Sequence, residues 1–140
     1  MLQRRSGVNL WRAKLATKRS NLSVHTRCVQ KNRMIFIYVP CQNLDTAKSI
    51  AKILVEKRMA GKVDIMPTNS VTRENGLPAQ AGGLVETAGA TMIIMTIDKH
   101  VQDIEDTVRE HYQGGVPCMA TLSLYRLNRD FKDWLINSTS

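Results

Sequence analysis

Residues 34–140 carry hydrophobic patterns of two kinds, one with the period of a strand and one with the period of a helix. Short runs of β-branched, aromatic and other apolar residues, or alternation of apolar and polar residues, predict strands. Four segments have this character: residues 34–39, 63–66, 91–96 and 119–125. We expect Pro40 and Pro67 to end the first two strands, because proline cannot donate a hydrogen bond to a neighbouring strand.

Three further segments place apolar residues three or four positions apart, which predicts amphipathic helices. They contain, in order, Ala47, Ile50, Ala51, Leu54 and Val55; then Val101, Ile104 and Val108; then Phe131, Trp134 and Leu135. Residues able to cap a helix N-terminus precede each one: Asn43 or Asp45, Asp98, and Asn128 or Asp130. Gly61 and the pair Gly114-Gly115 are expected to end the first two helices.

The predicted elements follow the order βαββαβ with a helix at the C-terminal end. This order is typical of a ferredoxin-like α+β sandwich, in which an antiparallel sheet carries two helices on one face. Residues 69–90 are rich in glycine and contain the turn signal Asn75-Gly76, so they predict an extended hairpin or loop. The other face of the sheet would expose apolar side chains, and an oligomer is the simplest way to cover it.

Charge divides the chain of 140 residues into two parts. The formal net charge is +8, yet residues 1–33 contain nine Lys and Arg and no Asp or Glu. Residues 34–140 therefore hold 11 basic against 12 acidic residues and are close to neutral. We expect a basic N-terminal extension at 1–33 and one folded domain at 34–140. No run of 18 apolar residues occurs, which argues against a transmembrane helix.

Three interpretations of residues 1–33 compete. Val8, Trp11 and Leu15 share one side of a helical wheel and the segment lacks acids, which is typical of a mitochondrial targeting segment leading to the matrix. A retained basic arm could instead lie on RNA or on a partner within a large mitochondrial complex. In the third interpretation the segment is an upstream extension ahead of a start at Met34, and the protein is cytoplasmic.

The candidate chemistry is sparse. Cys28, Cys41 and Cys118 are an odd number at wide spacing, so we expect free thiols in a reducing compartment. The sequence has no phosphate-binding glycine motif, no zinc-protease motif and no nucleophile elbow. We find no candidate catalytic residue, and we expect that the protein is not an enzyme. His111, close to the bend at Gly114-Gly115, is the histidine with the strongest claim to a site.

Several segments between Met34 and Leu135 carry local signatures in a fixed order. They are residues 47–60, 63–67 with Ser70-Val71, 91–96, the stretch of His111, Val116-Pro117 and 120–122, and residues 128–135. Together these segments resemble the CutA family of divalent-cation tolerance proteins. The resemblance implies the ferredoxin-like fold and a homotrimer like those of CutA and the PII signalling proteins, with strand edges shared between subunits. It also implies a non-enzymatic role in binding or tolerating divalent metals such as copper.

The chain departs from the family where polar groups could build a pocket. The differing positions are Lys62 in place of a cysteine, Thr72-Arg73-Glu74 in place of Tyr-x-Trp, Met95 in place of a lysine and Cys118 in place of a glutamate. The apolar pattern that specifies the fold is kept, whereas the side chains that specify a site have changed.

Three hypotheses about function follow. In the first, the chain is a CutA-like metal-binding trimer, with Cys118 and His111 as a thiol–imidazole pair suited to copper or zinc and Cys41 as a third ligand. In the second, it is a structural subunit of a mitochondrial assembly such as a ribonucleoprotein, which its basic arm contacts. In the third, it is a PII-like sensor that binds a small ligand in a cleft between subunits, for which it uses the long loop of residues 69–90.

Overall fold

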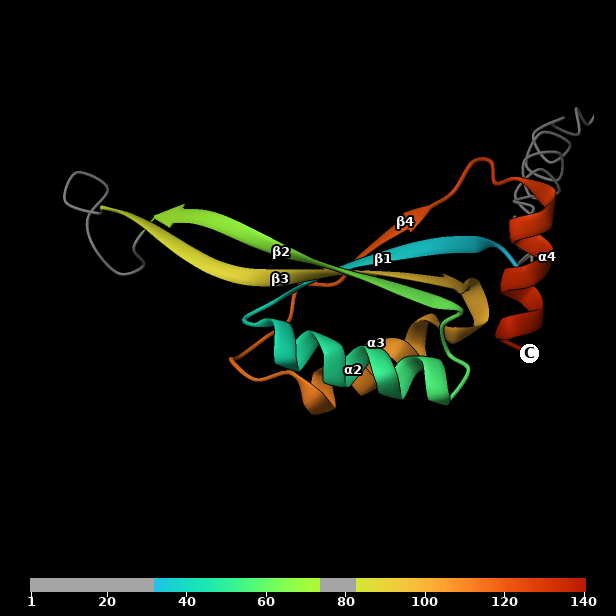
Figure 1. The fold of residues 1–140 in the computed structure, drawn as a ribbon, viewed down its shortest axis with the longest axis horizontal. Coiled ribbons are helices and arrows are strands. Elements are labelled where there is room, and N and C mark those ends of the chain that lie inside the picture. The colour runs from blue at the N-terminus through green and yellow to red at the C-terminus, as the bar shows by residue number, and fades with distance from the viewer. Residues whose placement is uncertain (1–31, 74–82) are drawn as a thin grey trace, which may run out of the picture.

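The computed structural model describes residues 32–73 and 83–140 of the chain (Figure 1). Its elements are β1 (Met34–Cys41), α2 (Leu44–Glu56), β2 (Lys62–Arg73), β3 (Leu84–Ile97), the 3₁₀ helix η1 (Asp98–His100), α3 (Val101–His111), β4 (Ala120–Ser123) and α4 (Arg129–Ser138). This is the predicted order. The predicted turn at Asn75-Gly76 and nearly all of the basic extension lie outside the described residues.

The four strands form one antiparallel sheet in the order β2-β3-β1-β4, which is a ferredoxin-like arrangement. Helices α2 and α3 cover the same face of this sheet, and α4 stands at one end of it (Figure 1). The α+β fold predicted from the sequence is therefore confirmed.

Alternate residues of the strands face α2 and α3 and form the main core. From β1 these are Ile35, Ile37, Val39 and Cys41, and from β3 they are Ala90, Met92 and Ile94. They pack against Ala47, Ile50 and Leu54 of α2 and against Ile104 and Val108 of α3. The periodicity of 2 in the strands and about 3.6 in the helices is what brings these residues into one layer.

A smaller core lies where α4 meets the sheet. Leu135 of α4 is fully buried against Met34 and Ile97, which are paired residues of β1 and β3. Phe131 also packs there, and its ring lies 5.2 Å from that of Trp134. The three residues expected to dock the last helix therefore lie on α4, although Trp134 remains 44% exposed.

The two prolines do not end their strands, contrary to the prediction. Pro40 lies inside β1 and is paired with Thr91 of β3, at a point that β4 does not reach. Pro67 lies inside β2, which is an edge strand of the sheet. In both places one side of the strand has no neighbouring strand among the described residues, so a residue without an N–H is tolerated. As a result β2 and β3 reach into the segment 69–90 that was expected to be mostly loop.

The predicted helix caps have mixed outcomes. Asn43 caps α2, because its Oδ1 accepts a hydrogen bond from the backbone N–H of Thr46 at 2.8 Å. Asp98 does not cap α3 but begins η1, which leads into that helix. Asn128 occupies the N-cap position of α4 without making a side-chain cap hydrogen bond. The last strand is also shorter than expected, because beyond Leu124 the chain leaves the sheet toward α4.

The open face of the sheet, on the side away from α2 and α3, carries apolar side chains from all four strands. The register places Met66, Ile93, Met95, Phe36, Tyr38 and Leu122 on it. Of these, Tyr38, Met66 and Leu122 are 41%, 42% and 54% exposed in the single chain. The part of this face that α4 does not cover is therefore an apolar surface of the kind that subunit interfaces bury.

Candidate functional site

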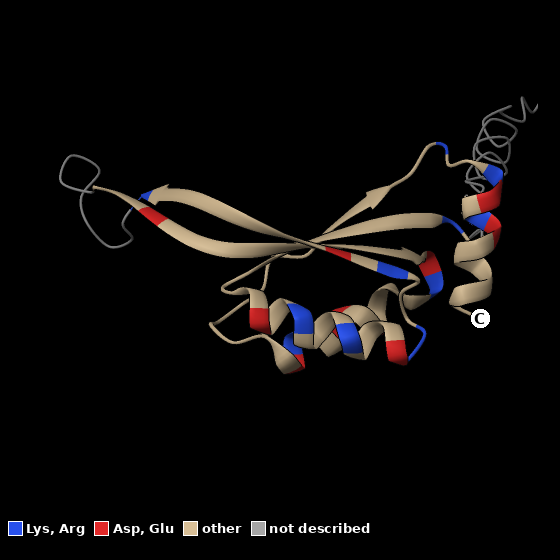
Figure 2. Ribbon diagram, viewed as in Figure 1, with Lys and Arg blue, Asp and Glu red and all other residues tan. Residues whose placement is uncertain are grey.

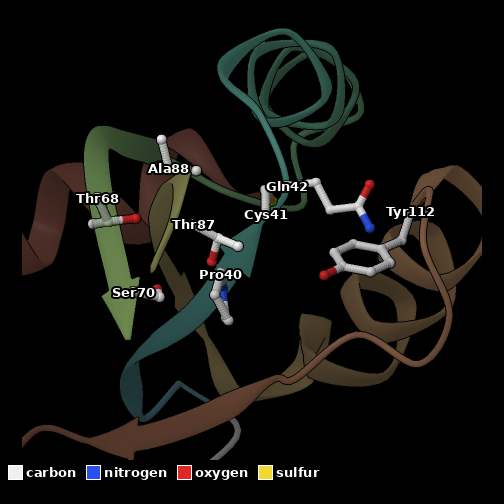
Figure 3. Close-up of a pocket in the computed structure, with 9 residues that line it drawn as sticks. Pro40, Cys41, Gln42, Thr68, Ser70, Thr87, Ala88 and Tyr112 are labelled. Carbon is white, nitrogen blue, oxygen red and sulfur yellow. The ribbon is translucent and has the colours of Figure 1, made fainter. Parts of the chain in front are cut away.

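A cavity of about 390 Å³ opens where β1 ends and the β2–β3 hairpin leaves the body of the domain (Figure 3). It is lined by Pro40, Cys41, Gln42, Thr68, Ser70, Thr87, Ala88, Gly89 and Tyr112. None of these residues is Lys, Arg, His, Asp or Glu. The cavity therefore offers hydroxyl, amide and thiol groups rather than charged ones.

Cys41 is the last residue of β1 and is only 6% exposed. Its Sγ lies 3.9 Å from the backbone oxygen of Val39, to which the thiol can donate a weak hydrogen bond. Burial raises the pKa of the Cys41 thiol above its ordinary value, because the low-dielectric surroundings disfavour the thiolate. The side chain is thus a neutral thiol in the wall of the cavity at pH 7.

Gly89 allows the backbones of β1 and β3 to approach each other beside the cavity. A Cβ atom at this position would lie 2.6 Å from the backbone oxygen of Cys41, which is closer than real Cβ atoms come to a backbone oxygen. Thr68 and Thr91 are joined nearby by a hydrogen bond of 3.1 Å between their hydroxyl groups. One side of the cavity is therefore built from closely packed strands.

Tyr112 follows directly after α3 and supplies the opposite side of the cavity, next to Gln42 (Figure 3). Burial is the largest cause of the rise in its pKa, and the negative charges of the Cys41 and Cys118 thiolates add to it. Gln42 packs over Gly114, whose φ of +118° and lack of a Cβ leave the space that the Gln42 amide occupies.

His111 lies in a different cavity. Its Nδ1 is 2.9 Å from the backbone oxygen of Thr107, and because a carbonyl only accepts, Nδ1 must donate and Nε2 is left free. The side chain lines a cavity of about 330 Å³ at the start of α2, together with Asn43, Asp45, Thr46, Ser49 and Gln113. A histidine held in this way can ligate a metal through Nε2.

The three predicted ligands are not gathered into one site within a single chain. Cys41 and His111 line separate cavities, and Cys118 is exposed in the segment before β4. Across residues 32–73 and 83–140, no three His, Cys, Asp or Glu side chains lie close enough together to hold a metal ion. Whether any of the three residues binds a metal stays a prediction.

Sequence reasoning missed the hydroxyl-bearing residues of the first cavity and Tyr112. Thr68 and Ser70 are two positions apart, and Ser70 pairs directly with Thr87 across the hairpin. The β-branched content after Pro67, with Thr68, Val71 and Thr72, is itself a strand signal. It was hidden by the expectation that Pro67 ends the strand.

Comparison with known proteins gives one consistent result. Residues 35–138 match the family model described as CutA1 divalent ion tolerance protein. The divalent-cation tolerance protein CutA of Archaeoglobus fulgidus is 30% identical over 101 residues, which are 71% of this chain and 92% of that protein. The CutA of Thermus thermophilus is 29% identical over 107 residues, covering 76% of this chain and 96% of that protein.

A solved structure agrees with this result. The Archaeoglobus fulgidus periplasmic divalent cation tolerance protein CutA superimposes with a TM-score of 0.68 at 26% identity, covering 76% of this chain and 99% of the other. Within the residues that the structure describes, no helix is long and apolar enough to cross a membrane. The extent of the match to the family model, together with the relative at 30% identity, shows that the chain belongs to the CutA1 family of divalent ion tolerance proteins.

Proposed function

We propose that this chain is a non-enzymatic homotrimer that binds divalent metal ions, with copper or zinc as the ion. The observation that carries the proposal is the match of residues 35–138 to the CutA1 family, whose similar proteins are named for divalent-cation tolerance. The trimer is supported by the open face, on which Tyr38, Met66 and Leu122 stay at least 41% exposed in a single chain.

The donor atoms suit these ions, but one chain does not arrange them into a closed site. Thiolate and imidazole are preferred ligands of copper and zinc. However, Cys41 is a buried neutral thiol, and His111 faces a separate cavity. Within residues 32–73 and 83–140, a site with more than two protein ligands therefore requires residues from a second copy. Cys118 is the best placed of the three, because its thiol is exposed shortly before the edge strand β4.

A metal titration of the full chain tests this proposal. We expect wild-type protein to bind Cu²⁺ or Zn²⁺ at micromolar concentrations by calorimetry, and native mass spectrometry to place the ions on the trimer rather than on the monomer. Cys118→Ala and His111→Ala should each weaken binding, whereas Cys28→Ala serves as the matched thiol control. Absence of binding of copper, zinc and cadmium at micromolar concentrations would rule out the metal-binding role.

A second candidate function is that of a PII-like sensor of a small ligand, and the cavity of about 390 Å³ favours it. Its lining of hydroxyl and amide groups suits an uncharged polar molecule better than a polyphosphate. The probes are adenosine and ATP, with the melting temperature as the readout. A rise with adenosine that is lost in Tyr112→Ala would support the sensor, and no rise at millimolar concentrations of either probe would reject it.

For location we propose mitochondrial import directed by residues 1–33, which carry nine basic residues and no acid. A fluorescent protein fused behind these residues should enter mitochondria, and the same fusion with Arg4, Arg5 and Arg12 changed to Glu should not. A diffuse signal from the unaltered fusion would favour the alternative of a cytoplasmic protein that starts at Met34.

A further inference from the structure

A groove with basic walls lies at the end of the sheet where α4 docks, far from the cavity of Figure 3. Its volume is about 260 Å³, and it is lined by Asn32, Arg33, Met34, Leu124, Tyr125, Arg126, Leu127 and Lys132. Three of these side chains are cationic and none is anionic. In Figure 2, basic residues appear ahead of β1, on the loop between β4 and α4, and on α4 itself.

The cations of this groove are not neutralised by nearby carboxylates. Asp130 and Asp133 are neighbours of Lys132 in sequence on α4. However, the salt bridges found among residues 32–73 and 83–140 involve only Lys62 and Arg109 as the basic partners. Arg33, Arg126 and Lys132 are all exposed. Their charge is therefore available to an anionic partner at moderate ionic strength.

An aromatic side chain stands directly beside these charges. Tyr125 is 104% exposed, so its ring makes almost no contact with the rest of the domain. It precedes Arg126 and lies in the same groove as Lys132. Cations that contact phosphates, combined with an exposed ring on which a base can stack, are the elements of single-strand nucleic-acid binding.

We propose that the groove of Arg33, Tyr125, Arg126 and Lys132 binds single-stranded RNA. The Arg and Lys side chains contact phosphates, and Tyr125 stacks on a nucleobase. The exposed amide of Asn32 can hydrogen-bond a ribose 2′-hydroxyl. An acidic peptide would use the charges but would give no role to the exposed ring. The proposal concerns a surface of the folded domain and does not depend on metal binding.

Fluorescence anisotropy with a labelled 12-mer of uridine tests the proposal on the full chain. Tyr125→Ala should weaken binding at least about fivefold, because a stacked base contributes at least about 1 kcal/mol. Tyr125→Phe should stay within about twofold of wild type, since it keeps the ring. Arg126→Ala/Lys132→Ala should reduce the slope of log K against log salt by about 1.4, the value expected for two lost contacts to single-strand phosphates.

The matched control is Lys48→Ala/Lys52→Ala, which removes the same charge from exposed positions of α2, a helix that contributes no residue to this groove. This pair should leave the affinity for RNA unchanged. The basic extension is present in the control and in the groove variants alike, so it does not account for a difference between them. The proposal is overturned if Tyr125→Ala binds like wild type, or if the control pair weakens binding as much as the groove pair. It is also overturned if polyglutamate competes as well as the RNA, or if a thymidine 12-mer binds equally tightly.

Discussion

At the scale of single residues, burial gives the two described thiols opposite properties. Cys41 is 6% exposed and its pKa is raised, whereas Cys118 is exposed. The reactive form of cysteine is the thiolate, so both access and charge disfavour reaction at Cys41. The sequence alone could not show which of the two thiols is buried, because each is a lone cysteine near a predicted strand.

We predict that iodoacetamide at pH 7.5 alkylates Cys118 much faster than Cys41, with each site followed by peptide mass spectrometry. Since burial raises the pKa of Cys41, its alkylation rate should keep increasing up to a higher pH than the rate of a free thiol before it levels off. In 6 M guanidinium the two sites should react alike. Equal rates in the folded protein would show that Cys41 is not protected as the structure implies.

At the scale of elements, tertiary context decided where strands end and which caps form. Pro67 was expected to break a strand, yet β2 continues because its proline lies on an edge. Asn43 and Asn128 stand at equivalent N-cap positions, but only Asn43 uses its side chain to bind the backbone of its helix. Asparagine is a favourable N-cap residue at both positions, and the local backbone geometry allows the side-chain hydrogen bond at Asn43 only.

We predict that Asn43→Ala lowers the free energy of unfolding by about 1 kcal/mol, the usual cost of losing an N-cap side chain. Asn128→Ala is the matched control and should change it by no more than a few tenths, because it removes no cap hydrogen bond. Urea unfolding at one fixed protein concentration measures both. Similar losses in the two variants would contradict the assignment of the caps.

At the scale of the whole molecule, the sheet has one face covered by α2 and α3 and an open face that α4 covers only at one end. Large apolar side chains remain exposed on the uncovered part, with Leu122 of the edge strand β4 the most exposed of Tyr38, Met66 and Leu122. Burying such a surface between copies would be favourable by about 25 cal/mol per Å² of apolar area. Self-association should therefore depend on this face.

We predict that Leu122→Lys reduces the native mass of the protein from that of the proposed trimer to that of a smaller species. Val55→Lys is the control, because Val55 is 44% exposed on α2, away from the open face. Native mass spectrometry at micromolar concentration distinguishes the two. A wild-type protein that is already monomeric, or a trimer that survives Leu122→Lys, would reject the open face as the interface.

The sequence by itself determined the order of elements, the α+β fold and the core residues, because apolar periodicity is a local property that hydrophobic burial turns directly into layers. This periodicity predicted the fold, and the resemblance of segments between Met34 and Leu135 to CutA proteins predicted the family. Only the tertiary structure decided that Cys41 and His111 face different cavities and that Thr68, Thr87 and Tyr112 share one. These side chains come from distant parts of the chain. Whether they lie close together depends on strand register and on where the strands end, which local hydrophobic periodicity does not determine.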